Sequence, residues 1–425
     1  MTGRQSTPPP RRAGPLAGVR VVELAGIGPA PFAGMLLGDL GADVVRVDRP
    51  GTTALGVEPA RDVTNRNKRS VLVDLKSADG PGTVRDLAAR ADILIEGYRP
   101  GVAERLGVGP RQCRAVNPAL VYGRMTGWGQ DGPLAPRAGH DIGYIATAGA
   151  LGMIGAPDGP PAIPANLLGD YAGGSLYLVV GVLAALLTAR VTGAGQVVDA
   201  AIVDGTAHLT AIVQGMLASG SWQDGRGRNL LDGGCPYYAV YETRDGGWMA
   251  VGALEPQFYA EFVRLLGLDA DDLPDRADPR GWPDLRDRFT ARFKAADREA
   301  WTAVFEGTDA CVAPVLSLRE AARHPHLRHR RTFTEEHGIV QPGTAPRFSA
   351  TPGTLRRPPA LPGAHQHEVA RDWRIPALTG APPPATQDPV SGTQDPVSGT
   401  QDPVSGTQDP VSGTPAPEAP TEDGR

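Results

Sequence analysis

Short apolar runs alternate with longer mixed stretches along most of the chain. Runs rich in valine, isoleucine and leucine predict strands at Val19–Leu24, Val44–Asp48, Val71–Leu75, Ile93–Glu96, Leu120–Gly123 and Val197–Ile202. Helical stretches lie between several of them, the first over about Ala33–Leu40. Because short apolar strands separated by helices favour parallel sheets, the pattern predicts an α/β fold built on a large, doubly wound, Rossmann-like sheet.

The pattern changes after about residue 215. The segment YAVYETRDGGWMAV alternates polar and apolar residues around a DGG turn, which is typical of a β-hairpin. Helices are predicted to follow at Pro256–Leu266, Arg286–Ala296 and Asp297–Phe305. We therefore expect a large α/β domain at 15–215, a smaller α+β domain with linkers at 216–320, and a return to the large domain at 321–378.

Both ends of the chain are predicted to be disordered tails. Residues 1–14 are rich in proline and arginine and lack the apolar segment of a signal peptide. Residues 379–425 contain TQDPVSG four times without a break, from Thr386 to Gly413. A repeat with one valine per unit buries too little apolar surface to fold. We expect the C-terminal tail to take no part in catalysis.

Composition narrows the classes of partner. The 42 Lys and Arg residues nearly balance 47 Asp and Glu residues, so the net charge of −5 does not indicate nucleic-acid binding. Three widely spaced cysteines exclude a disulfide framework and suit a reducing, cytoplasmic setting. The longest apolar run, Leu176 to Leu187, is too short to span a bilayer and is interpreted as a buried core helix. We expect no membrane partner.

Candidate ligand-binding residues follow several predicted strands. The loop Gly26–Pro31, with Asp48 beyond it, superficially resembles a dinucleotide fingerprint, but its two prolines argue against NAD binding. Arg49 follows the second strand, where an arginine suits a phosphate group. The basic segment Asn65–Arg69 is interpreted as a loop that either gathers phosphate charge or is a solvated face. Gly97–Arg99 adds an aromatic ring and a cation after another strand. Together they favour a ligand with several phosphates and a ring.

Longer motifs carry a specific resemblance. They include GIGPAPFAGMLLGDLGADVVRVDRPG, EGYRPGVAERLGVGP, YGRMTGWGQDGP, AGHDIGYIA, NLLGDYAGG, LDGGCPYYAVY, VGALEPQFY and TDACVAPVL. From about Pro15 to Trp373 the chain resembles the α-methylacyl-CoA racemases, which belong to the wider family III CoA-transferase superfamily. The histidine of AGHDIGYIA and the LEP segment resemble the racemase branch. Cys235, where the racemases usually have alanine, and the repeat tail are the departures.

The resemblance implies roles for individual residues. His140 and Asp170 would be the opposed catalytic acid and base. Glu255 would orient and charge the histidine from the other subunit of an interlocked homodimer. Asp141, Tyr144 and Asn166 are candidate supporting residues around the catalytic groups. The family's CoA contacts map to Arg49, Val73, Asp74, Leu75, Lys76, Gly97, Tyr98, Arg99, Arg105 and Gly139.

The chemistry of these residue types agrees with the resemblance. Epimerising the carbon next to a thioester requires a base on one face and an acid on the other, and His and Asp both serve near neutral pH. Asp170 is predicted to open an apolar helix over Ala172–Leu187, whose backbone N–H groups would hold the enolate oxygen. His140 is predicted to begin a helix, which favours its neutral form. We expect no metal and no cofactor, because CoA is part of the substrate.

Three alternatives stay open. In a family III CoA-transferase, Asp170 would instead attack the thioester as a nucleophile. A non-catalytic acyl-CoA-binding protein would have no need of His140, Asp170 and Glu255 together. An NAD-dependent dehydrogenase is the third alternative. The acyl chain of the substrate does not follow from the sequence, and a branched fatty acid, a sterol side chain and a secondary-metabolism intermediate all fit.

Overall fold

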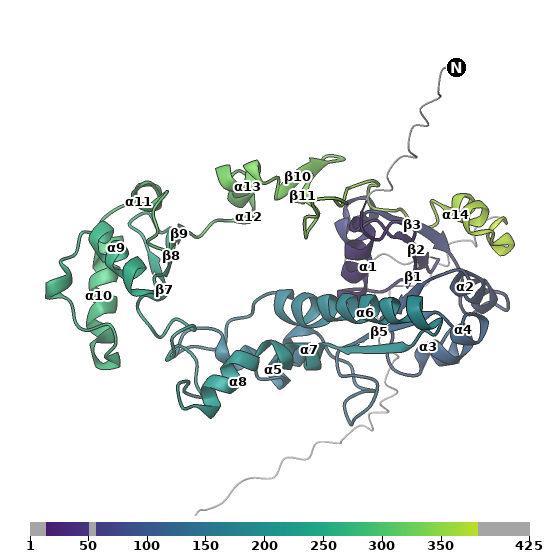
Figure 1. Ribbon diagram of the computed structural model, residues 1–425, viewed down its shortest axis with the longest axis horizontal. Coiled ribbons are helices and arrows are strands. Elements are labelled where there is room, and N and C mark those ends of the chain that lie inside the picture. Colours follow the sequence, from purple (N-terminus) through teal and green to yellow (C-terminus); the bar gives the residue numbers. More distant parts are fainter. Residues whose placement is uncertain (1–13, 51–56, 381–425) are drawn as a thin grey trace, which may run out of the picture. The chain divides into compact units, whose positions relative to one another are not determined.

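A six-stranded parallel sheet organises the larger part of the chain. The computed structural model describes residues 14–50 and 57–380 (Figure 1). The strands are β1 (Arg20–Leu24), β2 (Asp43–Asp48), β3 (Lys68–Leu72), β4 (Ile93–Glu96), β5 (Val121–Thr126) and β6 (Val197–Ala201). Their order is β3-β2-β1-β4-β5-β6, with every pair parallel. The predicted doubly wound α/β fold is confirmed.

Helices cover both faces of the sheet because consecutive strand residues point to opposite sides. On one face Val22, Val45 and Leu94 pack with α2 (Gly80–Ala88), α3 (Val102–Arg105), α4 (Pro110–Val116) and α14 (Gln366–Trp373). On the other face Val21, Val44 and Ile93 pack with α1 (Pro29–Asp39) and α6 (Leu176–Thr192). The remaining helices of this part are α5 (Asp141–Thr147), α7 (Ile202–Leu209) and α8 (Ala211–Ala218).

A three-stranded antiparallel sheet forms around the predicted hairpin. Its strands are β7 (Tyr238–Glu242), β8 (Trp248–Gly252) and β9 (Val312–Pro314), in that order. It packs with α9 (Pro256–Leu266), α10 (Trp282–Phe293) and α11 (Arg298–Phe305) around an aromatic core (Figure 1). Helix α9 has the predicted bounds, α10 begins four residues earlier than expected, and β9 was not predicted. The domain boundaries stay a prediction.

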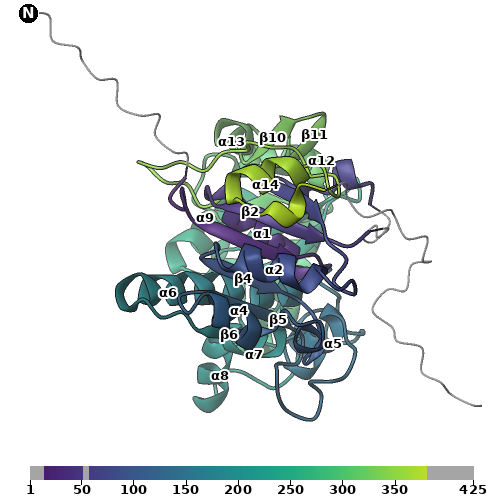
Figure 2. The same cartoon turned by 90° about the vertical axis from the view of Figure 1, so that its right-hand side faces the viewer.

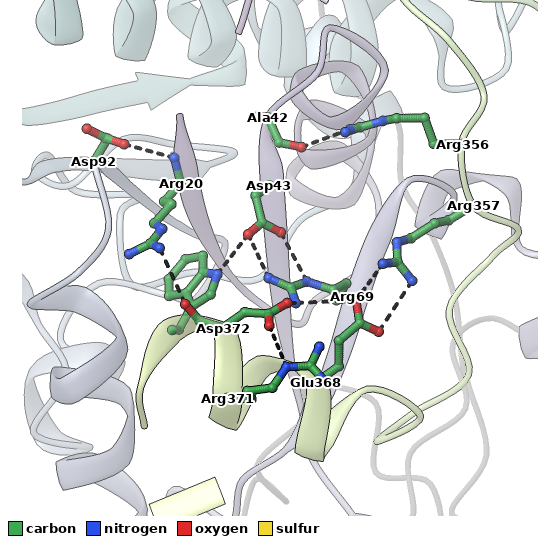
Figure 3. A network of polar contacts seen from close by, with 11 residues as sticks. Arg20, Ala42, Asp43, Arg69, Asp92, Arg356, Arg357, Glu368, Arg371 and Asp372 are labelled. Atoms are coloured by element: carbon green, nitrogen blue, oxygen red, sulfur yellow. Dashed lines mark hydrogen bonds and ion pairs between the residues drawn. The ribbon is translucent and has the colours of Figure 1, made fainter. Parts of the chain in front are cut away.

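The chain then returns to the larger sheet. It passes through α12 (Leu318–Ala321), α13 (Pro325–His329), β10 (Phe333–Glu336) and β11 (Ile339–Pro342). Helix α14 lies beside β3 (Figures 1 and 2). Figure 3 shows how charge holds it there: Arg69 of β3 pairs with Asp43 at 2.6 Å, Asp372 at 2.9 Å and Glu368 at 3.4 Å. The Trp373 indole N–H donates to Asp43 at 2.8 Å.

The interpretation of Asn65–Arg69 as a basic loop is wrong. Strand β3 begins at Lys68, three residues before the predicted strand. Lys68 is fully buried and pairs with Glu23 at 2.7 Å, while Arg66 pairs with Asp39 at 2.6 Å. Each cation therefore has an internal carboxylate, so the segment is neither a solvated face nor a collector of phosphate charge.

The predicted apolar helix is longer than expected and buried on one face only. A π-helix, η4 (Leu167–Ser175), continues directly into α6. The continuous helix has 26 residues, and its most apolar 18-residue window has a mean hydropathy of 1.9 and is half buried. By length and composition alone it is long and apolar enough to cross a membrane. The buried face packs on the sheet. The exposed face carries Leu176, Val180, Leu187 and Val191.

Candidate functional site

The candidate site lies where the sheet changes direction. Strand order reverses between β1 and β4, and open α/β sheets bind ligands at the carboxyl ends of strands beside such a point. The segments that follow these strands approach closely, since a Cβ atom added to Gly97 would lie 3.3 Å from the Cβ of Ala30 in the first turn of α1. Arg49 follows neighbouring β2. The sheet thus gathers residues from separate loops at one edge.

Asp170 lies against the first turn of α1. Gly28, the N-cap of α1, has φ 72°, and a Cβ atom added there would lie 3.2 Å from Asp170 Oδ2. Asn166 Nδ2 donates to the same oxygen at 3.3 Å. Burial raises the pKa of Asp170, the Asn166 hydrogen bond lowers it, the charge of Asp141 raises it, and the charge of His140 lowers it. The net direction is upward, so Asp170 keeps its proton to a higher pH than an ordinary aspartate does.

His140 precedes α5 and is exposed. The prediction that it begins a helix is therefore correct, since it is the N-cap of α5. Its carbonyl accepts the N–H groups of Gly143 at 2.9 Å and Tyr144 at 3.3 Å. Its neighbour Asp141 bonds to the Asp170 backbone, so the two candidate catalytic groups share one site although they come from different helices.

Asp141 joins the two segments. It follows His140 directly, and its Oδ1 accepts the Asp170 N–H at 2.6 Å. Gly169 makes this contact possible, because a Cβ atom there would lie 2.4 Å from Asp141 Oδ1. Asp141 is buried, and its Oδ2 has no hydrogen-bond partner within the described residues. One side chain therefore fixes the spacing between the histidine and the aspartate.

The helix around Asp170 differs from the predicted one. Asp170 does not open a helix at Ala172; it is the fourth residue of η4, which begins at Leu167. The Asp170 N–H donates to Asp141, so this backbone group is not available to an enolate oxygen as the sequence suggested. Wide turns of this type occur often at functional sites. The Ser175 hydroxyl lies 2.7 Å from Pro29 O and 3.0 Å from Asp170 O, so it ties the end of η4 to α1.

Tyr144 fills the space between the catalytic and the CoA-binding candidates. Its ring lies over two glycines, since Cβ atoms on Gly127 and Gly139 would come within 1.9 Å and 2.5 Å of it. Burial raises the pKa of Tyr144 to about 12; the charge of Asp170 also raises it, and that of Arg99 lowers it. Tyr144 thus interacts with a charged group of each kind, Asp170 and Arg99.

The CoA-binding candidates divide into two groups. Burial raises the pKa of Tyr98 to about 12, while the charge of Arg49 acts in the opposite direction, so these two side chains are close. Arg49, Lys76, Gly97 and Arg105 are exposed at this edge. In contrast, Val73 and Leu75 belong to the hydrophobic core. Asp74 accepts the Lys76 N–H at 2.9 Å. Only the backbone of Val73 and Leu75 is therefore suited to touch a ligand.

Glu255 lies beyond the end of β8 in the smaller sheet, not at the edge that carries His140. It is the N-cap of α9 and is exposed. Among residues 14–50 and 57–380, no hydrogen bond or ion pair joins Glu255 to His140 or Asp170. Over the same ranges no group of three His, Cys, Asp or Glu side chains is placed to hold a metal ion. The structure thus brings together His140, Asp170, Asp141, Tyr144 and Asn166 in one chain.

Sequence reasoning missed two parts of the site. One is Ser175, which bridges η4 to α1. The other is the Lys68–Glu23 pair behind α1, where Lys68 Nζ also donates to Pro31 O at 2.9 Å. The one sequence signal for this ion pair is Lys68 itself, a charged residue shortly before a run of strand-forming residues.

Comparison with known proteins identifies the family of the chain. A sequence model described as CoA-transferase family III matches residues 16–367. The chain belongs to this family. A solved structure, that of a CaiB/BaiF family protein from Brucella suis, has a TM-score of 0.75 at 27% identity, covering 85% of this chain and 100% of that one.

Curated members of family III include both racemases and transferases. The α-methylacyl-CoA racemase of Mus musculus is 44% identical over 361 residues, covering 84% of this chain and 93% of the relative. The human racemase is 42% identical over 363 residues with the same coverage. Succinyl-CoA:glutarate CoA-transferase of Mus musculus is 30% identical over 379 residues, covering 84% of this chain and 86% of the relative. The resemblance to the racemases is confirmed.

Proposed function

We propose that this family III chain is an isomerase that epimerises the 2-methyl centre of 2-methylacyl-CoA thioesters. The observation that carries the proposal is the link made by Asp141, which follows His140 and accepts the Asp170 N–H at 2.6 Å, so that the histidine and the aspartate lie at one site although they belong to different segments. The identity of 44% and 42% to racemases supports it, against 30% to the transferase.

In the proposed reaction, one group removes the α-proton and the other returns a proton to the opposite face. His140 takes the proton of one stereoisomer, which gives an enolate and an imidazolium, and protonated Asp170 donates to the enolate carbon. The reverse sequence serves the other stereoisomer. The raised pKa of Asp170 suits this role because it leaves more of the carboxyl group protonated near neutral pH. Because each group exchanges its proton with the α-carbon of the substrate, the proposed reaction requires no metal or further cofactor.

We propose that the CoA moiety binds along the edge that follows β2 and β4. Arg49, Arg99, Arg105 and Lys76 supply positive charge, and the Tyr98 ring and the Gly97 and Gly139 backbone supply surface for close approach. We further propose a homodimer in which Glu255 reaches the partner's site. The exposed apolar residues of α6 support association, since exposed apolar patches mark interaction surfaces.

The test follows α-proton exchange in D₂O from separate 2R and 2S thioesters, by NMR at early times. His140→Ala should suppress exchange of one stereoisomer by about 10²- to 10⁴-fold, and Asp170→Ala that of the other. Equal losses for both stereoisomers in both variants would contradict the assignment of two bases. Hydroxylamine trapping of an acyl-enzyme on Asp170 would instead indicate a CoA-transferase.

A further inference from the structure

The Arg276 guanidinium binds the backbone immediately before Glu255. Its Nη2 donates to Leu254 O at 2.7 Å and its Nη1 to Ala253 O at 3.4 Å. These two carbonyl groups lie beyond the end of β8 and lead directly to the N-cap of α9. A planar guanidinium with two donors fixes the orientation of successive peptide groups, which a single point charge does not. The direction in which Glu255 leaves the backbone is set at this point.

Two tyrosines hold the Arg276 guanidinium in place. It lies 4.8 Å from the ring centroid of Tyr237 and 4.7 Å from that of Tyr259, both within cation–π range. The two rings also contact each other edge to face at 5.5 Å. Tyr259 is tied to the same loop, because its N–H donates to Glu255 O at 2.9 Å. The tyrosines of the CPYYAVY and EPQFY motifs thus converge on one arginine.

The backbone of Arg276 is fixed as well. Its carbonyl accepts the Trp282 indole N–H at 2.9 Å and the Tyr237 hydroxyl at 3.3 Å. Both ends of the residue are therefore held, and the loop before Glu255 is attached to a rigid cluster. Such a cluster is more than the start of α9 requires, because Pro256 at N1 already favours a helix there.

We propose that Arg276 is a positioning residue that aims the Glu255 carboxylate at the catalytic histidine. The proposal rests on the proposed function, in which Glu255 orients and charges that histidine. Arg276 acts only through Glu255 and does not touch substrate. Its loss should therefore lower kcat and leave the KM for acyl-CoA within about twofold, because misplacing a catalytic group by about 1 Å costs up to 10²-fold in rate.

The experiment compares Arg276→Met with the parent enzyme in two backgrounds, wild type and Glu255→Gln. In wild type, kcat for α-proton exchange should fall by about 10- to 100-fold. In the Glu255→Gln background the same change should cost less than about twofold, because there is no carboxylate left to aim. Arg276→Lys keeps the charge over the rings and one donor, and it should restore part of the loss.

Arg286→Met is the matched control. Arg286 lies on α10, and its Nη2 also donates to two successive carbonyl groups, Gly233 O at 2.6 Å and Gly234 O at 2.8 Å. It should leave kcat within about twofold. Equal losses in Arg276→Met and Arg286→Met, or an Arg276→Met loss that persists in the Glu255→Gln background, would overturn the proposal. A Glu255→Gln enzyme with full activity would instead overturn the role of Glu255 in the proposed function.

Discussion

Replacing Lys68 by methionine should be among the most destabilising changes to this protein. Lys68 and Glu23 have fully buried side chains, and their charges lie 2.7 Å apart. Lys68 Nζ also donates to Pro31 O at 2.9 Å and to Asn65 Oδ1 at 3.3 Å. Methionine fills the same volume but leaves the Glu23 carboxylate buried without its cation and two acceptors without their donor.

The expected cost is about 3–5 kcal/mol of unfolding free energy, the usual penalty for leaving one member of a buried ion pair uncompensated. Most domains have only about 5–15 kcal/mol of stability in total. The double variant Glu23→Gln/Lys68→Met has no buried charge, so it should regain a substantial part of the loss. Gly34 leaves little room for rearrangement, because a Cβ atom there would lie 1.8 Å from Glu23 Oε2.

Urea unfolding of the wild type and of both variants measures these differences. Lys294→Met is the control, since Lys294 forms an ion pair with Glu242 in which both side chains are about two-fifths exposed. It should cost no more than about 1 kcal/mol. The reasoning would be refuted if Lys68→Met cost no more than Lys294→Met, or if the double variant were less stable than Lys68→Met.

The Lys68→Met defect should also depend on pH. Burial raises the pKa of Glu23, and the nearby Lys68 charge lowers it. Without Lys68, the folded variant keeps a proton on Glu23 at pH values where the unfolded chain, with a pKa of about 4.3, has released it. Stability is then present at low pH and lost as pH rises through the folded pKa. Relative to wild type, Lys68→Met should be less destabilised at pH 5 than at pH 8.

Two further predictions concern the site. Asn166→Ala removes a donor that lowers the pKa of Asp170, and Asp141→Asn removes a charge that raises it. The assay is the pH dependence of kcat/KM for the stereoisomer that Asp170 deprotonates. Its acid limb should move to higher pH in Asn166→Ala and to lower pH in Asp141→Asn. Shifts in the same direction would contradict this account. In a dimer that exchanges Glu255, mixing inactive His140→Ala and Glu255→Ala subunits should restore one complete site per heterodimer. No recovery despite demonstrated exchange would place Glu255 outside the partner's site.

The sequence was most informative where a local pattern decides the structure. The ends of apolar strands predicted where Arg49 and Tyr98 lie, and the structure brings them close. The start of a helix at His140 followed from residues next to it in the chain. The antiparallel hairpin followed from alternation around its turn. Each of these features depends on a few neighbouring residues.

The features that the sequence did not reveal depend on distant partners. The π-helix around Asp170 packs against α7, where Gly205 approaches so closely that a Cβ atom would lie 1.8 Å from Gly173 O. Lys68 is buried against Glu23, a partner that lies 45 residues earlier in the chain. No local rule for helix or strand propensity contains these contacts. For the same reason, β3 begins three residues and the apolar helix five residues before its predicted start.

The ion pairs between Arg69 of β3 and the carboxylates of α14 have a consequence for how the chain folds during its synthesis. All six strands of the parallel sheet are synthesised by residue 201, yet two of the three carboxylates that neutralise Arg69 lie about 300 residues after it. A nascent chain therefore exposes one flank of β3, with its cation only partly compensated, until the ribosome has released almost the whole enzyme. Because N-terminal parts generally fold first during synthesis, this strand edge is the place where a folding chain is open to chaperones and to wrong partners.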